Sequence, residues 1–99
     1  MTPRYRLLAL DLDGTILDMR LRMDPADVAA LQRIKDGGVT VIVTTGRPFP
    51  GALPWAQKLG LEGPIICYQG AQIRTPDGEV LLDHGVPHDL AMEVVRFAR

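Results

Sequence analysis

The sequence of 99 residues has one cysteine and no long apolar segment. A lone Cys67 cannot form a disulfide within the chain, so a reducing, cytoplasmic setting is expected. Cys67 stands in an apolar stretch without a cationic neighbour in sequence, which predicts a buried, unreactive thiol. No apolar run approaches the roughly 18 residues of a membrane span, so no membrane partner is expected. The first residues lack the apolar region and cleavage site of a signal peptide.

The chain also lacks an excess of either charge. Its formal net charge is -1, and its lysines and arginines form no basic stripe. No nucleic acid partner is therefore expected. Internal repeats and low-complexity segments are absent from the sequence. With 46% hydrophobic and 23% charged residues, this length fits one small globular domain.

Apolar runs alternate with helical patterns along the sequence. Strands are expected at 5–10, 39–43 and 64–68, helices at 25–36, 50–59 and 89–99, and a hairpin at 71–75 and 79–82. Strands that alternate with helices predict an α/β fold, with a parallel sheet and right-handed crossovers. The last helical pattern has no stop signal, so the chain is expected to end inside an element.

Local signals sharpen three of these elements. Asp24 can cap the first helix, with Pro25 at its first position, where a missing N–H costs nothing. The nearly continuous apolar run 7–10 predicts a strand that is buried on both faces. Pro54 falls early in the second helix, where it either is tolerated or kinks the segment.

Polar clusters follow the first two expected strands. Asp11 and Asp13 come after the first strand, and Thr44 and Thr45 come after the second. Ligands of parallel sheets bind at the carboxyl ends of the strands, where both clusters fall. Two carboxylates two residues apart repel each other, and a hard cation such as Mg²⁺ would relieve that repulsion.

Such a cluster suits phosphoryl transfer. One carboxylate can attack phosphorus and form an aspartyl-phosphate, while the other protonates the leaving group and later activates water. A threonine hydroxyl and the main-chain N–H groups around Gly14 and Gly46 can bind phosphoryl oxygens. The alternative interpretation is that Asp11 and Asp13 are turn and capping residues, as Asp often is.

A calcium loop can be excluded. Asp11 and Asp13 have the spacing that begins an EF-hand loop. That loop requires Asp or Asn, Gly and Glu at the positions that Thr15, Ile16 and Arg22 occupy here. The two aspartates therefore do not begin an EF-hand.

Three motifs together resemble the haloacid dehalogenase superfamily. Asp11-Leu12-Asp13-Gly14-Thr15 is similar to its first motif, and Val41-Ile42-Val43-Thr44-Thr45-Gly46-Arg47-Pro48 to its second motif in the Cof-like, sugar-phosphatase branch. Ile66-Cys67-Tyr68-Gln69-Gly70-Ala71-Gln72-Ile73 resembles the Asn-Gly-Ala stretch that follows, with Gln69 where Asn is usual. The motifs occur in the family's order over roughly residues 5 to 82.

The resemblance implies a role for each matching residue. Asp11 would be the nucleophile and a Mg²⁺ ligand. Asp13 would be the general acid and base, and its main-chain carbonyl would be a second metal ligand. Thr45 would bind the transferring phosphoryl group together with the neighbouring Gly46. Arg47 and Gln69 would either meet the substrate or support the turns that carry them.

The chain lacks two further motifs of the family. These are a lysine that neutralises the phosphoryl group and an acidic pair that completes the magnesium shell. Lys35 and Lys58 both fall inside expected helices, in no matching context. The resemblance therefore implies a partial Rossmann-like core, truncated before its later strands. Residues 1–82 would be the N-terminal part of this core, and 83–99 the start of a cap domain.

The function implied is a Mg²⁺-dependent phosphomonoester hydrolase that acts on a sugar phosphate or similar small metabolite. Without the two missing motifs, this chain is expected to be weak or inactive as a catalyst. The alternatives are a non-catalytic remnant, a fragment that binds a partner, or a phosphotransferase with the same chemistry. A sheet without its later strands would also expose an edge, through which copies of the chain can associate.

Overall fold

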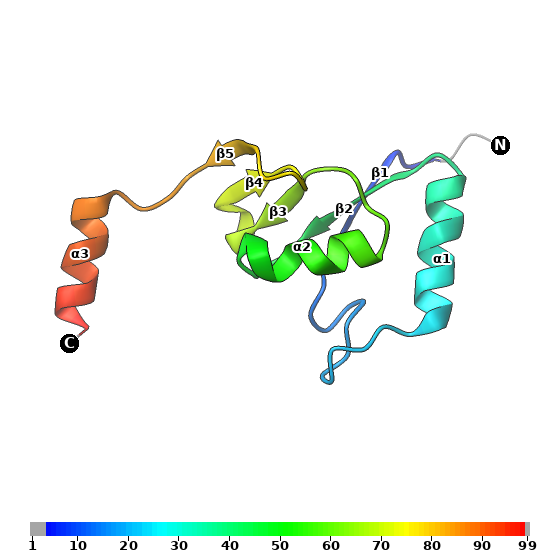
Figure 1. Ribbon diagram of the computed structural model, residues 1–99, viewed down its shortest axis with the longest axis horizontal. Helices are drawn as coiled ribbons and strands as arrows, with labels where there is room; N and C mark the ends of the chain where they lie inside the picture. Colours follow the sequence, from blue (N-terminus) through cyan, green and yellow to red (C-terminus); the bar gives the residue numbers. More distant parts are fainter. Residues whose placement is uncertain (1–3, 99) are drawn as a thin grey trace.

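The structure, a computed structural model, describes residues 4–98 (Figure 1). Its elements are β1 (Leu7–Leu10), α1 (Pro25–Asp36), β2 (Thr40–Thr44), α2 (Phe49–Lys58), β3 (Ile65–Cys67), a 3₁₀ turn (Tyr68–Gly70), β4 (Gln72–Arg74), β5 (Val80–Asp83) and α3 (His88–Phe97). This order confirms the expected succession of strands, helices and hairpin. The strand expected from residue 5 begins at Leu7, and residue 99, the expected end of the last helix, lies outside the described residues.

The strands form one sheet in the order β1-β2-β3-β4-β5. The first three strands are parallel, and β4 and β5 are added antiparallel as the predicted hairpin. Helices connect the parallel strands, because strands that run in the same direction need a crossover between them. The prediction of an α/β fold with a parallel sheet and flanking helices is therefore confirmed.

The core lies on one face of this sheet. Alternate residues of β1, β2 and β3 face it, and α1 and α2 supply the opposing side chains. Leu10, Val43 and Ile65 are aligned across the three strands and are all buried. The full set of buried hydrophobic residues is Leu10, Leu12, Ile16, Leu17, Leu31, Val41, Val43, Phe49, Ala52, Ala56, Leu59, Leu61, Ile65 and Cys67. The burial expected of Cys67 is thus confirmed, and that burial raises the pKa of its thiol.

The prediction that β1 is buried on both faces is wrong for this chain. Leu8 and Leu10 point into the core, whereas Leu7 is 56% exposed and Ala9 is also exposed. The reason is that β1 is an edge strand and that the core cluster occupies the other face of the sheet. An apolar run indicates that both faces can be buried, but the covering elements must be present for this to happen.

The helices begin largely as their sequences indicate. The Asp24 carboxylate accepts a hydrogen bond of 2.8 Å from the Ala26 N–H, so the predicted cap of α1 is confirmed. Helix α2 continues through Pro54 to Lys58. Pro54 is exposed on the outer side of the helix, and Ala52 and Ala56 fill the side that faces the sheet. The helix therefore tolerates this proline.

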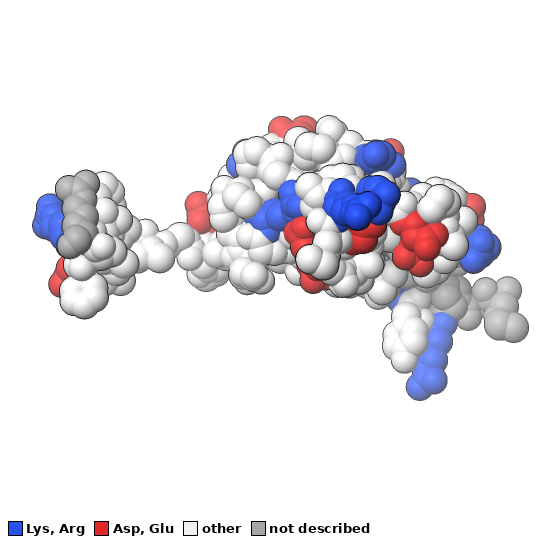
Figure 2. All heavy atoms as spheres, turned by 90° about the horizontal axis from the view of Figure 1, so that it is seen from below, with Lys and Arg blue, Asp and Glu red and all other residues white. Residues whose placement is uncertain are grey.

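Helix α3 stands at one end of the molecule, beyond an extended segment that follows β5 (Figure 1). Its apolar side chains are exposed, with Leu90 at 50%, Val94 at 59% and Phe97 at 92%. Between residues 4 and 98, no helix has the length and apolar character needed to cross a membrane. On the face shown in Figure 2, basic and acidic side chains are interspersed.

Candidate active site

The ends of β1 and β2 bring the two polar clusters together. Asp11 directly follows β1, and Thr45 directly follows β2. These strands are parallel neighbours with Leu10 opposite Val43, so both chains leave the sheet at the same edge. An open depression of about 380 Å³ lies there, lined by Asp11, Asp13, Thr45, Gly46, Arg47 and Gln69. Six of the seven residues expected at the site are therefore neighbours.

Arg47 binds Asp13 through two hydrogen bonds. Its Nε donates to Asp13 Oδ2, and its Nη2 donates to Asp13 Oδ1, each at 2.8 Å. A two-pronged contact of this kind fixes the orientation of both groups. The pair joins the turn after β1 to the turn after β2, across 34 positions of sequence. This contact was missed by reasoning from sequence, which left Arg47 between a substrate role and a structural one.

The ion pair changes the titration of Asp13. The hydrogen bonds from Arg47, aided by its positive charge, lower the pKa of the Asp13 carboxyl below its ordinary value. Asp13 likewise raises the pKa of Arg47. Because the folded-state pKa of Asp13 is depressed, the pair favours folding above the unfolded pKa of this carboxyl. That contribution is lost as the pH falls through the folded pKa.

Replacing Arg47 by Gln is expected to raise the pKa of Asp13 toward its ordinary value, because the two charge-assisted hydrogen bonds disappear. The titration is followed through the ¹³C signal of the Asp13 side-chain carboxyl in wild type and in Arg47→Gln. The side-chain carboxyl signal of Asp77, an exposed residue in the turn before β5, is the internal control, and the substitution should leave it unchanged. An unchanged pKa of Asp13 in the variant would show that the pair does not persist in solution.

Among residues 4–98, Thr45 is the one polar residue that is buried, with 4% of its surface exposed. Its Oγ1 accepts a hydrogen bond of 3.1 Å from the Arg47 N–H. A hydroxyl that accepts one hydrogen bond keeps its own hydrogen free to donate. Gly46 follows directly, and its main-chain N–H is a further donor in the same turn. The turn after β2 can therefore present donors to an anion bound in the depression.

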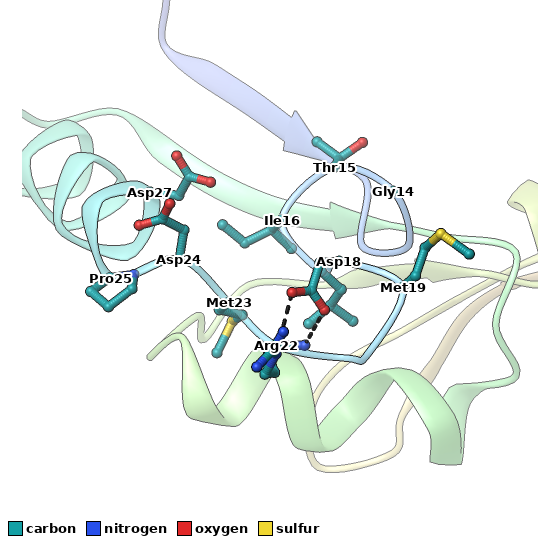
Figure 3. A pocket seen from close by; sticks show the side chains of 11 residues that line it. Gly14, Thr15, Ile16, Asp18, Met19, Arg22, Met23, Asp24, Pro25 and Asp27 are labelled. Carbon is teal, nitrogen blue, oxygen red and sulfur yellow. Dashed lines mark hydrogen bonds and ion pairs between the residues drawn. The ribbon is translucent and has the colours of Figure 1, made fainter.

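Gly14 is the expected site residue that does not join this group. Its N–H donates to the Leu17 carbonyl at 2.9 Å and is therefore already engaged. Gly14 lines a separate depression of about 680 Å³, formed by the loop that precedes α1 (Figure 3). The carboxylate of Asp18 accepts hydrogen bonds from the Arg20 and Arg22 N–H groups there. That carboxylate holds the loop together, and Asp24 caps the helix.

Asp11 and Asp13 offer a partial set of ligands for a cation. The Asp11 carboxylate accepts a hydrogen bond from the Leu12 N–H through Oδ1, at 2.9 Å, and Asp11 lines the depression. Among residues 4–98, no group of three His, Cys, Asp or Glu side chains is placed to hold a metal. Mg²⁺ often binds through one or two carboxylates and completes its shell with water and phosphate oxygens. The donors present fit such a site in part.

Comparisons with known proteins agree with the motifs. HMP-PP phosphatase of Serratia proteamaculans (strain 568) is 35% identical over 91 residues, which are 92% of this chain and 33% of that protein. Pyridoxal phosphate phosphatase YbhA of Escherichia coli (strain K12) is 35% identical over 78 residues, which are 79% of this chain and 29% of that protein. The chain thus spans about a third of the length of these curated relatives.

Solved structures share the fold. A haloacid dehalogenase-like hydrolase from Bacteroides thetaiotaomicron superposes with a TM-score of 0.83 at 28% identity, over 97% of this chain and 38% of that chain. One from B. subtilis gives a TM-score of 0.79 at 27% identity, over 93% and 32% of the two chains. The family model for haloacid dehalogenase-like hydrolases matches residues 8–99. The chain therefore belongs to this family of hydrolases, in its Cof-like branch, and corresponds to the N-terminal portion of its members.

Proposed function

We propose that this chain carries the nucleophile half of a phosphomonoester hydrolase site. The observation that supports it best is the joint position of Asp11, Asp13, Thr45 and Gly46 in one open depression at the carboxyl ends of β1 and β2. A carboxylate nucleophile, an acid and base, and neutral donors for the phosphoryl oxygens are the groups that such a reaction requires.

In the first step, an Asp11 carboxylate oxygen attacks phosphorus, and the bond between phosphorus and the ester oxygen breaks. The protonated carboxyl of Asp13 gives its proton to the departing oxygen, which leaves as an alcohol. Arg47 holds the Asp13 carboxylate ionised in the structure described, so Asp13 must take up a proton before this step. Thr45 and Gly46 donate hydrogen bonds to the phosphoryl oxygens.

In the second step, water attacks the phosphorus of the aspartyl-phosphate. Asp13, now a carboxylate, accepts a proton from that water. The acyl phosphate bond breaks, which releases inorganic phosphate and restores Asp11. Asp13 thus gives one proton to the alcohol in the first step and regains one from water in the second, so it ends the cycle in its starting state.

Mg²⁺ is the proposed cofactor. The Asp11 carboxylate and the main-chain carbonyl of Asp13 would hold it, and it would neutralise charge on the phosphoryl oxygens. Neither lysine nor a further carboxylate lines the depression in the described part of the chain. Each missing electrostatic group of this type costs about a hundred- to a thousandfold in rate. We therefore expect slow turnover by the isolated chain.

The substrate class proposed is a small phosphorylated metabolite, such as a sugar phosphate. The two relatives described above support it at this level, since they are named as phosphatases of HMP-PP and of pyridoxal phosphate. We further propose that 1–82 is the core and that 83–99 begins a cap. The second candidate function is binding of a partner without catalysis. It is favoured by the absence of a lysine among the described residues that line the depression. Self-association through the edge strands remains a prediction.

Metal removal tests the proposed chemistry. Phosphate release from an aryl phosphate by the purified chain should be slow, should require Mg²⁺ and should stop when EDTA is added. Retained amide dispersion in the NMR spectrum with EDTA is the control for folding. Equal rates with Mg²⁺ and with EDTA would contradict the proposal. Rates as fast as those of a full-length relative would contradict the expected weakness of this chain.

A further inference from the structure

The turn between β3 and β4 is held in an unusual backbone conformation beside the site. Tyr68 and Gln69 both have left-handed φ angles, of 52° and 58°. Neither residue is a glycine, and such a conformation is strained for other residues, so it persists only where the surroundings impose it. Strain of this kind is concentrated at functional sites, which makes the side chain carried by this turn worth following.

Two hydrogen bonds impose this conformation. The Tyr68 N–H donates to the Arg47 carbonyl and the Gln69 N–H donates to the Thr45 carbonyl, each at 3.0 Å. Both acceptors belong to the turn that follows β2, which carries the proposed phosphoryl donors. The two turns are thereby fixed to each other, and Gln69 is placed beside Thr45 and Gly46.

The side chain of Gln69 packs against Gly46, in the space that a side chain at position 46 would occupy. A Cβ atom built on Gly46 would lie 2.9 Å from Gln69 Cδ, and closer still to its Nε2. Any side chain at position 46 would therefore displace the carboxamide. The absence of a side chain at Gly46 thus lets the Gln69 carboxamide line the depression with Asp11 and Asp13.

The side chain of Gln69 differs from those of its neighbours in its hydrogen bonding. Two of the guanidinium nitrogens of Arg47 are engaged by Asp13, and the hydroxyl oxygen of Thr45 accepts from a main-chain N–H. The hydrogen bonds of Gln69 within residues 4–98 are made by its main chain. Its carboxamide is consequently available to a ligand as both a donor and an acceptor.

We propose that Gln69 is a specificity-determining residue that contacts the substrate. Its carboxamide hydrogen-bonds a hydroxyl of the leaving group, next to the phosphoryl group held at Thr45 and Gly46. A hydroxyl both donates and accepts, which matches the two halves of a carboxamide, whereas a bare phosphate dianion uses only the donor half. An ester with a hydroxyl beside the phosphoryl group should therefore bind more tightly than an alkyl phosphate. This inference rests on the proposed function, because it presumes a phosphoryl group at Thr45 and Gly46.

The test compares two esters of the same carbon count. Glycerol phosphate carries hydroxyls beside the ester and propyl phosphate has none. Each is titrated into the ¹⁵N-labelled 99-residue chain with Mg²⁺ present, and amide shifts give the affinity. Because a net hydrogen bond is worth about 0.5–1.5 kcal/mol, we expect glycerol phosphate to bind about two- to tenfold more tightly. The Gln69 side-chain NH₂ signals should shift with glycerol phosphate and not with propyl phosphate.

The variant Gln69→Met keeps the length of the side chain and removes its hydrogen-bonding atoms. It should bind both esters with the affinity that wild type has for propyl phosphate. The inference would be overturned if a folded Gln69→Met variant still bound glycerol phosphate more tightly than propyl phosphate. It would also be overturned if the Gln69 NH₂ signals of wild type did not shift with glycerol phosphate. Because the NH₂ signals are measured in wild type, they test the role of Gln69 even if the variant does not fold.

Inorganic phosphate separates this inference from the function beneath it. Shifts of the Thr45 and Gly46 amides with inorganic phosphate, without any preference between the esters, would overturn the role of Gln69 alone. The phosphoryl site would then stand. If no phosphate compound shifts the Thr45 and Gly46 amides, the phosphoryl site and the role of Gln69 both fail.

Discussion

Replacement of Asp11 by Asn is expected to reduce phosphate release to the level of a protein-free sample. The amide oxygen of Asn is a poor nucleophile, so the bond to phosphorus does not form. The side chains have nearly the same shape, and Asn can still accept the hydrogen bond that the Leu12 N–H gives to Asp11. The fold should therefore persist, and the effect should be on chemistry alone. Phosphate release at saturating aryl phosphate, with Mg²⁺, measures it.

A matched variant separates the nucleophile from the loss of a negative charge. Asp77→Asn removes one carboxylate from an exposed turn outside the depression and should release phosphate at the wild-type rate. If Asp11→Asn released phosphate as wild type does, Asp11 would not be the nucleophile. An equal loss in Asp77→Asn would trace the effect to net charge instead.

Leu12→Ala is expected to lower the free energy of unfolding by about 3 kcal/mol, the largest stability effect that we predict. Leu12 lies between the two aspartates and is fully buried, at 0% exposure. Truncating a buried leucine removes apolar contacts and leaves a cavity, at a cost of about 2–5 kcal/mol. Such a loss is a large part of the about 5–15 kcal/mol that stabilise a typical domain.

Urea denaturation followed by circular dichroism measures this change. Met19→Ala is the control, because Met19 is 101% exposed in the loop before α1 and its truncation should change the free energy by less than about 0.5 kcal/mol. Equal losses in the two variants would mean that the described burial of Leu12 does not hold in solution. A Leu12→Ala variant with the wild-type free energy of unfolding would lead to the same conclusion.

The local signals of the sequence predicted the elements well. The cap at Asp24 and the β-branched run 39–43 depend on residues adjacent in sequence, and both specify the structure that is found. Which face of a strand is buried depends on what packs against it. For this reason the apolar run of β1 predicted two buried faces, whereas Leu7 is exposed. The buried positions of Leu12 and Leu17 have the same non-local origin.

Six of the seven residues expected at the site from sequence line one depression, but the contacts among them were not predicted. Strand ends placed Asp11 and Thr45 together, because parallel neighbours end at one edge of a sheet. The pairing of Arg47 with Asp13 depends on how two turns face each other in space, which no local pattern carries. The left-handed backbone of Gln69 is similar in this respect, since its N–H donates to the carbonyl of Thr45, which is far away in sequence. Gly14 was expected at the site, and its N–H serves its own turn instead.

The residue to which phosphate becomes attached is the most direct test of the proposed chemistry. The chain is incubated with acetyl phosphate and Mg²⁺, quenched in acid, digested, and analysed by mass spectrometry. We predict a slow, hydroxylamine-sensitive phosphorylation on Asp11 that is absent from Asp11→Asn. A folded wild-type chain without that label, or one that carries it on another residue, would contradict the assignment of Asp11 as the nucleophile.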